Sequence, residues 1–445
     1  MNSCSEYVSS GHPDKTADLI ASHLLDEYVK HDPKTRFAME VQLKDYTCNL
    51  AGEVTSAWHP TDKEIDNLVR DAIRKVGYTP EYAAQWPDGA TLNADKVEVN
   101  NFIGQQSPDI AQGVDREGWG DQGTMMSMAT SEQQYGYMPR DRYFAHEIGR
   151  RLYDAALEHK IPIGLDIKTL VSLKDDTNAE QVIVAAPMLP EDEYIAKQAI
   201  ANIVHDVLCE RNHKCGELVI NGTGYYVVHS SVGDAGVVGR KLAVDFYGLN
   251  CPVGGGSPWG KDATKADLTL NLAARYFALK ELLANPGRHK TVYTKIACCI
   301  GQSKCLVAYL DERHEVYRQE QVDIIPSQTI HQFGLDGSVS DDMFFRLCRH
   351  DLFEYVDLLA QRENSTTMTK EQFGNRVNKM FLSRMNGWGK KPTELFIVGD
   401  EAKAVIRNEF AYHEKCFHER PKELSKEAYW ESAIVSTAHC LTLLF

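Results

Sequence analysis

The sequence is short of positive charge. Its 445 residues include 48 lysines and arginines against 63 aspartates and glutamates, which gives a formal net charge of −15. Broad binding to a nucleic-acid backbone needs the opposite balance, so we expect no nucleic-acid partner. Basic residues that do cluster are expected to meet a small polyanion held in a pocket.

The sequence also lacks metal-type cysteine spacing and long apolar runs. Its 11 cysteines form no C-x-x-C pair, which favours free thiols in a reducing compartment. No apolar run approaches membrane-spanning length, and residues 1–8 contain no basic n-region or apolar h-region. These absences predict a cytoplasmic protein with no membrane partner.

Length and periodicity indicate several mixed domains. A chain of 445 residues is too long for one ordinary core, and 43% apolar with 25% charged residues is typical of a globular protein. Apolar spacing predicts helices over residues 16–29, 62–76, 191–209 and 263–283. It predicts strands over residues 35–44, 49–57, 166–174, 181–186, 241–247, 291–300 and 306–310. Thr61 and Glu64 have the spacing of a capping box for the second helix, and Gly77 marks its end.

The order of these elements suggests one α/β unit repeated three times. We expect an N-terminal α/β domain over residues 1–110, a central one over 111–231 and a C-terminal one over 232–361. After residue 361 the chain is more polar and less periodic. Residues 362–445 are therefore expected to form a divergent extension packed on the core.

The first cluster of reactive side chains lies where a helix should begin. Residues 10–15 read Ser-Gly-His-Pro-Asp-Lys, and free N–H groups at a helix start favour an anion. His12 and Lys15 can donate to a phosphate, and Asp14 can hold a hard cation. A capped helix with surface charges explains this hexapeptide equally well.

Two glycine-punctuated polar stretches follow at residues 104–115 and 120–123. Alone, they are typical of long connections or of the mobile walls of a site.

The richest cluster spans residues 233–241 and 254–267. If helical geometry already applies after the glycine-rich turn, Lys261 and Lys265 share a face, with Asp267 beside them as a metal ligand. This group suits a triphosphate. Residues 255–261 also have P-loop spacing, but Asp262 stands where that loop needs Ser or Thr, and Pro258 has no N–H to offer a phosphate.

Taken together, these stretches resemble the S-adenosylmethionine synthetase family. Five motifs occur in the family's order: G-H-P-D-K, G-x-Q-S-P-D-I-x-Q-G-V-D, G-D-Q-G, G-D-x-G-x-x-G-R-K and G-G-G-x-x-x-G-K-D-x-x-K-x-D. The resemblance implies a methionine adenosyltransferase of the α/β (α+β) class, with three similar α/β domains in a pseudo-threefold arrangement. It also implies ATP and L-methionine as substrates, two Mg²⁺ per site, K⁺, and a homodimer with active sites at the subunit interface, often paired into a tetramer.

The resemblance assigns roles to individual residues, motif by motif. The expected catalytic residues are His12, Lys168, Arg240 and Lys261. The expected ATP and phosphate ligands are His12, Lys15, Asp121, Lys168, Tyr226, Arg240, Lys241, Lys261 and Lys265. The expected methionine ligands are Glu53, Gln106, Asp234 and Lys265. Asp14 and Asp267 match the Mg²⁺ ligands, and Glu40 matches the K⁺ ligand.

Several stretches depart from the family pattern. Where the family has Gly-Arg-Phe-x-x-Gly-Gly, residues 224–230 read Gly-Tyr-Tyr-Val-Val-His-Ser, so Tyr226 is expected to stack on adenine in place of phenylalanine. The loop between Val114 and Gly120 is shorter than in bacterial relatives. The usual Gly-His-Phe-Gly run is not recognisable after Leu310.

The implied reaction needs no general base, because a thioether sulfur is a neutral nucleophile with no proton to lose. Methionine sulfur would attack C5′ of ATP in line and expel triphosphate, which the family hydrolyses to pyrophosphate and phosphate. Two other classes stay open. One is another ATP-dependent phosphoryl-transfer enzyme, which would ordinarily need a base; the other is a catalytically idle regulatory homologue, suggested by the divergent C-terminal region.

Overall fold

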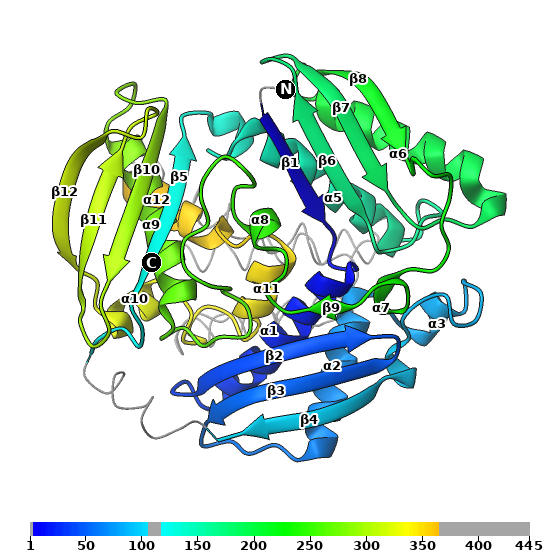
Figure 1. The fold of residues 1–445 in the computed structure, drawn as a ribbon, viewed down its shortest axis with the longest axis horizontal. Helices are drawn as coiled ribbons and strands as arrows, with labels where there is room; N and C mark the ends of the chain where they lie inside the picture. Colours follow the sequence, from blue (N-terminus) through cyan, green and yellow to red (C-terminus); the bar gives the residue numbers. More distant parts are fainter. Residues whose placement is uncertain (1–2, 106–116, 365–445) are drawn as a thin grey trace, which may run out of the picture.

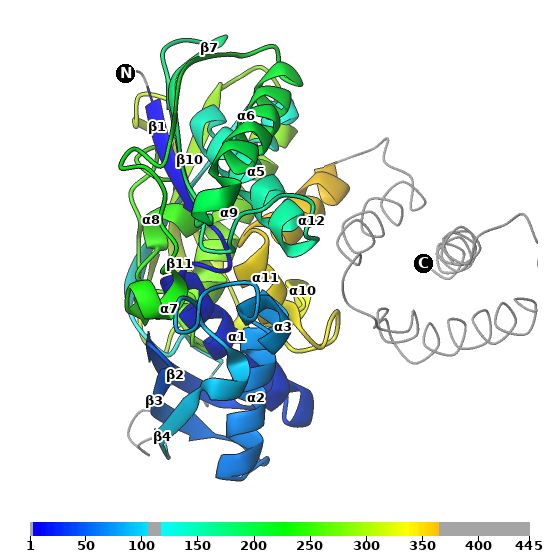
Figure 2. The same ribbon diagram turned by 90° about the vertical axis from the view of Figure 1, so that its right-hand side faces the viewer.

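Three four-stranded sheets are arranged around a central group of helices in the computed structural model of the chain, which describes residues 3–105 and 117–364 (Figure 1). Seen from the side, the sheets form one layer and the longer helices lie behind them (Figure 2). This is the predicted mixed α/β architecture of three similar units.

The first sheet has the strand order β4-β3-β2-β9. Its strands are β2 (Arg36–Lys44), β3 (Thr47–Thr55), β4 (Glu98–Gly104) and β9 (Gly236–Val237), and it packs on α1 (Pro13–His31) and α2 (Asp62–Val76). β2 alternates as predicted: Phe37, Met39, Val41 and Leu43 are buried, whereas Glu40 is exposed. The second predicted strand and the predicted second helix correspond to β3 and α2.

The second sheet has the order β1-β6-β7-β8. It contains β1 (Ser3–Val8), β6 (Lys168–Leu173), β7 (Asn178–Ala185) and β8 (Lys214–Ile220), with α5 (Arg140–Leu157) and α6 (Glu193–Cys209) on one face.

The third sheet has the order β12-β11-β10-β5. It contains β5 (Gly123–Thr130), β10 (Thr291–Cys298), β11 (Lys304–Leu310) and β12 (Val316–Asp323). Helix α9 (Ala266–Ala284) packs on β5 and β10, and α12 (Glu354–Asn364) packs on α9.

Shorter elements connect these layers. The short helices are α3 (Pro80–Ala83), α7 (Ser230–Gly233), α8 (Leu242–Asp245), α10 (Pro326–Gln332) and α11 (Met343–Arg349). Single 3-10 turns occur at Ala94–Lys96, Gln133–Tyr135 and Pro190–Asp192.

Each sheet includes one strand from a distant part of the chain. β1 pairs with β6, β9 pairs with β2, and β5 pairs with β10. The sheets therefore interleave along the sequence, so the expected divisions after residues 110, 231 and 361 stay predictions about sequence segments. Of the expected extension 362–445, residues 365–445 lie outside the described residues.

The strand predicted over residues 241–247 is wrong. Residues Leu242–Asp245 form the short helix α8, and the amides of Val244 and Asp245 both donate to the carbonyl of Lys241. Side chains from Val244 to Tyr247 are buried in succession instead of alternating. Contacts with other segments hold these side chains inward and override the local alternation.

No helix in residues 3–105 or 117–364 has both the length and the hydropathy that a membrane crossing requires.

Candidate active site

The start of α1 meets the segment that carries the predicted cations at 240–241. His12 is the N-cap of α1, and its Nδ1 accepts a hydrogen bond from the Asp14 amide at 3.1 Å. The Asp14 carboxylate is buried and accepts from the Val237 amide at 2.9 Å and from Lys241 Nζ at 2.6 Å. Arg240 Nε lies 3.5 Å from the same carboxylate. The structure therefore brings His12, Asp14, Arg240 and Lys241 into one group.

The His12 ring is neutral in this environment. Burial lowers the pKa of His12 to about 3, and the positive charges of Lys241 and Lys168 act in the same direction. Because Nδ1 accepts from the Asp14 amide, the ring proton is assigned to Nε2, which makes Nε2 a hydrogen-bond donor. Burial alone would raise the pKa of Asp14, but the Lys241 ammonium and the Val237 amide together lower it.

Lys168 and Tyr226 border the same group from the second sheet. Lys168 is the first residue of β6, and its charge acts on His12. The Tyr226 hydroxyl donates to the carbonyl of Asp166 at 2.9 Å. Burial raises the pKa of Asp166 to about 6, opposed by the Ser230 amide and by Lys168, and the nearby charge of Asp234 raises it further. Asp234, an expected methionine ligand, is exposed and lies on this side.

A second cationic segment lies beside β2. Lys261 forms an isolated antiparallel bridge with Ala38, and the Met39 amide donates to the Gly260 carbonyl at 2.7 Å. The Lys261 ammonium is paired with the Asp267 carboxylate, which also accepts from the Gly256 amide at 2.6 Å. Lys261 and Asp267 are thus brought together, as the sequence predicted.

Glycine at position 260 makes this approach possible. Its φ is +72°, and a Cβ at this position would lie 2.2 Å from the carbonyl oxygen of Met39. Any larger residue would push the Lys261 segment away from β2.

Glu53 and Glu40 share the outer face of the first sheet with Lys261. Ala38 stands directly opposite Glu53 on β3 and bridges Lys261 on its other side, so the three form a cross-strand row with a small residue at its centre. Glu40 lies two residues along β2, on the same face. Burial raises the pKa of Glu40, and the nearby charge of Lys261 opposes this shift.

The two cationic segments flank the same strand and touch each other. The Val238 amide donates to the carbonyl of Val41 on β2 at 3.0 Å. Val41 lies two residues after Met39, whose amide contacts Gly260. A Cβ on Gly239, whose φ is +77°, would lie 2.8 Å from the Ser257 side chain. The glycine-rich loop and the 236–241 segment therefore form one continuous wall.

Some predicted residues lie elsewhere. Lys15 is buried, and its Nζ lies 2.7 Å from Asp245 and 3.2 Å from Asp18, so it is engaged by two carboxylates instead of the phosphate group. We therefore leave Lys15 out of the proposed phosphate site. Gln106 lies outside the described residues.

The shared helical face predicted for Lys261 and Lys265 is wrong. Helix α9 begins only at Ala266, with Lys265 as its N-cap, so the two lysines are on a loop. The Lys265 ammonium lies 3.9 Å from Asp262, whereas that of Lys261 pairs with Asp267. Asp262 is itself held by the Phe37 amide at 2.8 Å, which fixes the loop against β2.

Asp121 is exposed and lies just before β5, on the side of the Lys261–Asp267 pair. Burial raises the pKa of Cys298, and the charges of both Asp121 and Asp267 raise it further. Asp121 and Asp267 thus both act on Cys298, and the role of Asp121 on the adenosine side stays a prediction.

Sequence reasoning missed two buried acids behind the site, Asp18 and Asp245. Asp18 follows Asp14 by one helical turn, and its carboxylate accepts from the Gly239 amide at 2.8 Å. That i, i+4 spacing of acids was a usable signal. Asp245 was a lone acid inside a predicted apolar strand, and this was a second usable signal.

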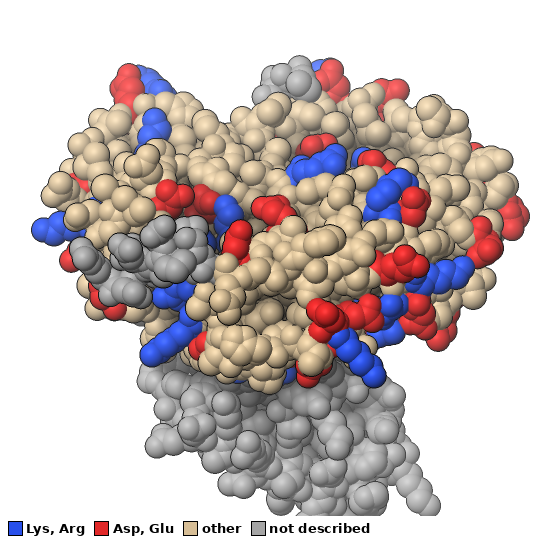
Figure 3. Space-filling view, turned by 60° about the horizontal axis from the view of Figure 1, so that its bottom comes forward, with Lys and Arg blue, Asp and Glu red and all other residues tan. Residues whose placement is uncertain are grey.

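The exposed charges are mixed in sign. On the face shown in Figure 3, lysine and arginine side chains alternate with aspartate and glutamate and form no single basic patch. This agrees with the expectation that basic residues act in a confined site.

The acids present suit Mg²⁺ bound together with substrate. Among the described residues, no group of three or more His, Cys, Asp and Glu could hold a metal alone. Mg²⁺ is commonly bound by one or two carboxylates, with phosphate oxygens and waters completing the shell. Asp14 and Asp267 each present a carboxylate beside phosphate-type cations, so the donor set fits this mode.

Comparison with known proteins agrees with the geometry. The N-terminal, central and C-terminal domain models of S-adenosylmethionine synthetase match residues 1–108, 116–226 and 228–337. An S-adenosylmethionine synthase of Helicobacter pylori (strain HPAG1) is 34% identical over 396 residues, covering 86% of this chain and 95% of that protein. One from Zymomonas mobilis is 36% identical over 323 residues, covering 69% and 80%.

A solved structure supports the same assignment. An unusual S-adenosylmethionine synthetase from Campylobacter jejuni matches with a TM-score of 0.69 and 28% identity, over 81% of this chain and 98% of that one. The chain therefore belongs to the S-adenosylmethionine synthetase family and is an enzyme of the methionine adenosyltransferase type.

Proposed function

We propose that the chain makes S-adenosylmethionine by direct attack of methionine sulfur on C5′ of ATP, with the triphosphate held by the two cationic segments beside β2. The observation that carries this proposal is the wall on which His12, Arg240, Lys241 and Lys261 gather with two carboxylates. Negative charge builds on the departing triphosphate, so fixed positive charge lowers the barrier most where it meets those oxygens.

In this proposal the lysines exchange partners when ATP binds. Lys241 and Lys261 are paired with Asp14 and Asp267 in the structure, and they would turn to phosphate oxygens while those carboxylates hold Mg²⁺. When bound, Mg²⁺ would supply positive charge that stabilises the departing triphosphate. His12 would donate from Nε2 to the leaving triphosphate, and Lys168 and Arg240 would neutralise its remaining charge. The same cations would serve the later hydrolysis to pyrophosphate and phosphate.

Methionine and adenosine would bind at the edges of this wall. Glu53, Asp234 and Lys265 are the proposed methionine contacts, because an α-amino acid needs both an acid and a cation. Tyr226 would stack on adenine, with Asp121 on the adenosine side. Glu40 presents a carboxylate on the outer face of the sheet beside Lys261, and this carboxylate is the proposed K⁺ ligand.

We also propose a homodimer with shared active sites, and two such dimers can pair into a tetramer. The outer face of the first sheet supports this, because Phe102 on β4 is 68% exposed. Phe102 stands opposite Ala51 of β3, which in turn stands opposite Glu40 of β2. Aromatic residues are enriched in protein–protein interfaces relative to the rest of the surface. Phe102→Glu should shift the mass measured by light scattering towards the monomer and lower activity.

Product analysis tests the function. Purified protein is incubated with ATP, L-methionine, MgCl₂ and KCl, and nucleotides and phosphates are separated by chromatography. S-adenosylmethionine with pyrophosphate and phosphate supports the proposal. Formation of ADP would favour another phosphoryl-transfer enzyme, and tight binding of ATP without turnover would favour an idle homologue.

A further inference from the structure

A buried carboxylate ties the two cationic segments together from behind. The side chain of Asp245 is 8% exposed, and each of its oxygens has one donor. Oδ1 accepts from Lys15 Nζ at 2.7 Å, and Oδ2 accepts from Trp259 Nε1 at 2.7 Å. Lys15 adjoins Asp14 on α1, and Trp259 lies two residues before Lys261 on the glycine-rich loop. One side chain thus contacts the residue next to the proposed metal ligand Asp14 and a residue two positions before the proposed phosphate ligand Lys261.

Further contacts close this network on itself. The Lys15 ammonium lies 4.5 Å from the centre of the Trp259 ring and 3.2 Å from Asp18. Asp18 accepts from the Gly239 amide at 2.8 Å, and Gly239 precedes Arg240 directly. Lys15, Asp18, Asp245 and Trp259 are all buried. Hydrogen bonds between such buried charged groups are strong and fix geometry.

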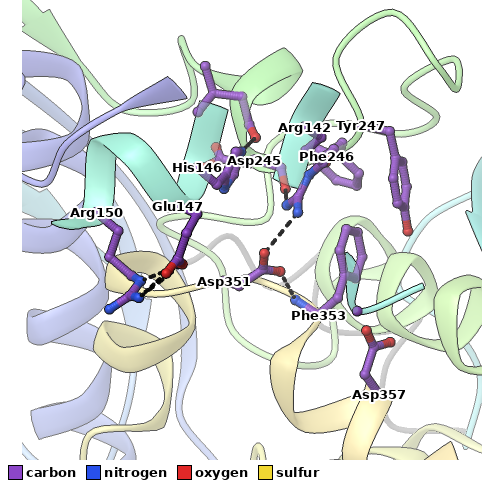
Figure 4. Close-up of polar contacts among 12 residues, drawn as sticks. Arg142, His146, Glu147, Arg150, Asp245, Phe246, Tyr247, Asp351, Phe353 and Asp357 are labelled. Carbon is purple, nitrogen blue, oxygen red and sulfur yellow. Dashed lines mark hydrogen bonds and ion pairs between the residues drawn. The ribbon is translucent and has the colours of Figure 1, made fainter. Parts of the chain in front are cut away.

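Helix α5 holds Asp245 in place from the other side (Figure 4). Arg142 Nη2 donates to the Asp245 carbonyl at 3.1 Å, and Arg142 Nη1 pairs with Asp351 at 2.9 Å. His146 Nε2 is 3.1 Å from the Val244 carbonyl. The backbone of α8 is therefore anchored to α5, which holds the Asp245 side chain in position.

We infer that Asp245 and Trp259 are positioning residues for the triphosphate: the carboxylate and the indole N–H hold the glycine-rich loop against α1, and so hold Lys261 in register with Asp14 and Lys241. This inference rests on the proposed function and extends it to residues that touch no substrate. The network ends on Lys15, Gly239 and Trp259, which stand one residue from Asp14, one from Arg240 and two from Lys261. A displacement of about 1 Å in such a site can change rates by large factors, which is why rigid support matters.

Trp259→Phe is the sharpest test, because it keeps an aromatic ring over Lys15 and removes the indole N–H that donates to Asp245 Oδ2. Binding of inorganic tripolyphosphate with MgCl₂ is measured by calorimetry, and steady-state kinetics are measured with ATP and with methionine. We expect the dissociation constant of tripolyphosphate and the KM for ATP to rise about tenfold. The KM for methionine should stay within about twofold, a split that a general loss of stability would not produce.

Trp119→Phe is the matched control. Trp119 is fully buried, and its Nε1 donates to the Ile324 carbonyl at 3.1 Å, so this variant also loses one buried indole hydrogen bond. It should lower the melting temperature and leave tripolyphosphate binding unchanged. An equal loss of binding in both variants would overturn the inference.

A double-mutant cycle tests whether Trp259 acts through the Asp245 carboxylate. The cycle uses Asp245→Ala in place of Asp245→Asn, because asparagine would keep an oxygen that accepts from the Trp259 indole. If Trp259 acts through Asp245, the double variant should bind tripolyphosphate no more weakly than Asp245→Ala alone. Additive losses would contradict the inference. If the wild-type protein itself neither binds tripolyphosphate nor forms S-adenosylmethionine, the proposed function fails; if it does both and Trp259→Phe equals it, only the positioning inference fails.

Discussion

Lys261 and Asp267 form a charge pair that is only partly buried, since their side chains are 27% and 24% exposed. Such pairs contribute about 0–1 kcal/mol to stability. Lys261→Ala or Asp267→Asn should therefore leave the melting temperature nearly unchanged while lowering kcat/KM about 10²–10³-fold, the range seen when one charge-stabilising donor is lost. S-adenosylmethionine formation and thermal denaturation measure the two effects. Lys30→Ala, at the exposed far end of α1, is the control, and full activity in either site variant would remove that residue from the proposed site.

His12 has two separable tasks, one at each ring nitrogen. Its Nδ1 caps α1, whereas Nε2 is the proposed donor to triphosphate. His12→Asn should keep the cap, because asparagine is among the best N-cap residues, and lose the donor. We expect kcat to fall about 10²-fold with little change in the free energy of unfolding. His12→Ala should lose the cap as well, about 1 kcal/mol in urea denaturation; an active His12→Asn would contradict the role of Nε2.

The sequence predicted residue types in this site better than their partners. Motif matching grouped Asp14, Arg240 and Lys241, and the structure brings these side chains together. Lys15 has the same charge and lies in the same hexapeptide, yet it points to Asp245, which is 230 residues away in sequence. No local pattern encodes that choice, because it depends on which carboxylate the fold brings within reach of the buried ammonium.

Among the secondary-structure contacts, the close packing of the glycine-rich loop on β2 depends on a glycine at position 260. Gly260→Ala should destabilise the protein by more than the roughly 1–2 kcal/mol that a left-handed alanine costs, because its Cβ would also meet the Met39 carbonyl. Gly287 is the matched control: its φ is +81°, and a Cβ there would meet nothing within 4 Å. Gly287→Ala should show the backbone cost alone, with activity unchanged. Equal losses in chemical denaturation would show that the β2 contact is unimportant.

Elements with local signals were predicted closely, and elements held by distant contacts were not. The predicted bounds of α2 are those observed, since the Thr61 amide donates to Glu64 at 2.7 Å and Gly77 has a φ of +109°. By contrast, residues 241–247 have the sequence alternation of a strand, but Leu242–Asp245 form α8 and the Asp245 side chain is held inside by Lys15 and Trp259. Local periodicity does not report such long-range partners.

Across the molecule, buried arginines join segments that lie far apart in the sequence. Arg275 of α9 is fully buried, and its guanidinium pairs with Asp357 of α12 and donates to the Tyr137 carbonyl. Arg142 connects α5 with Asp351 in the same way. The threefold repeat was predictable from element order, whereas the exchange of β1, β5 and β9 between sheets was not, because strand pairing over such separations has no local signature.

Buried neutral histidines should make global stability depend on pH, and His146 offers the clearest case. Burial lowers the pKa of His146 to about 3, with the charge of Arg142 acting in the same direction, against a usual value of 6.5. As the pH falls below about 6.5, the unfolded chain takes up a proton that the folded chain refuses, so this group's contribution favours unfolding by about 1.4 kcal/mol per pH unit. Its stabilising neutral form is fully present above that pH.

His146→Gln should remove this dependence, because glutamine can still donate to the Val244 carbonyl but cannot titrate. Urea denaturation at pH 5, 6, 7 and 8 gives the free energy of unfolding for each protein. Packing changes shift the variant's curve by a constant, whereas loss of the titrating group changes its slope, so the comparison rests on slopes. Below pH 6 the variant's stability should fall less steeply than that of the wild type by about 1.4 kcal/mol per pH unit. Parallel curves would mean that His146 is protonated equally in the folded and unfolded chains, and that its burial in the α5–α8 contact does not hold it neutral.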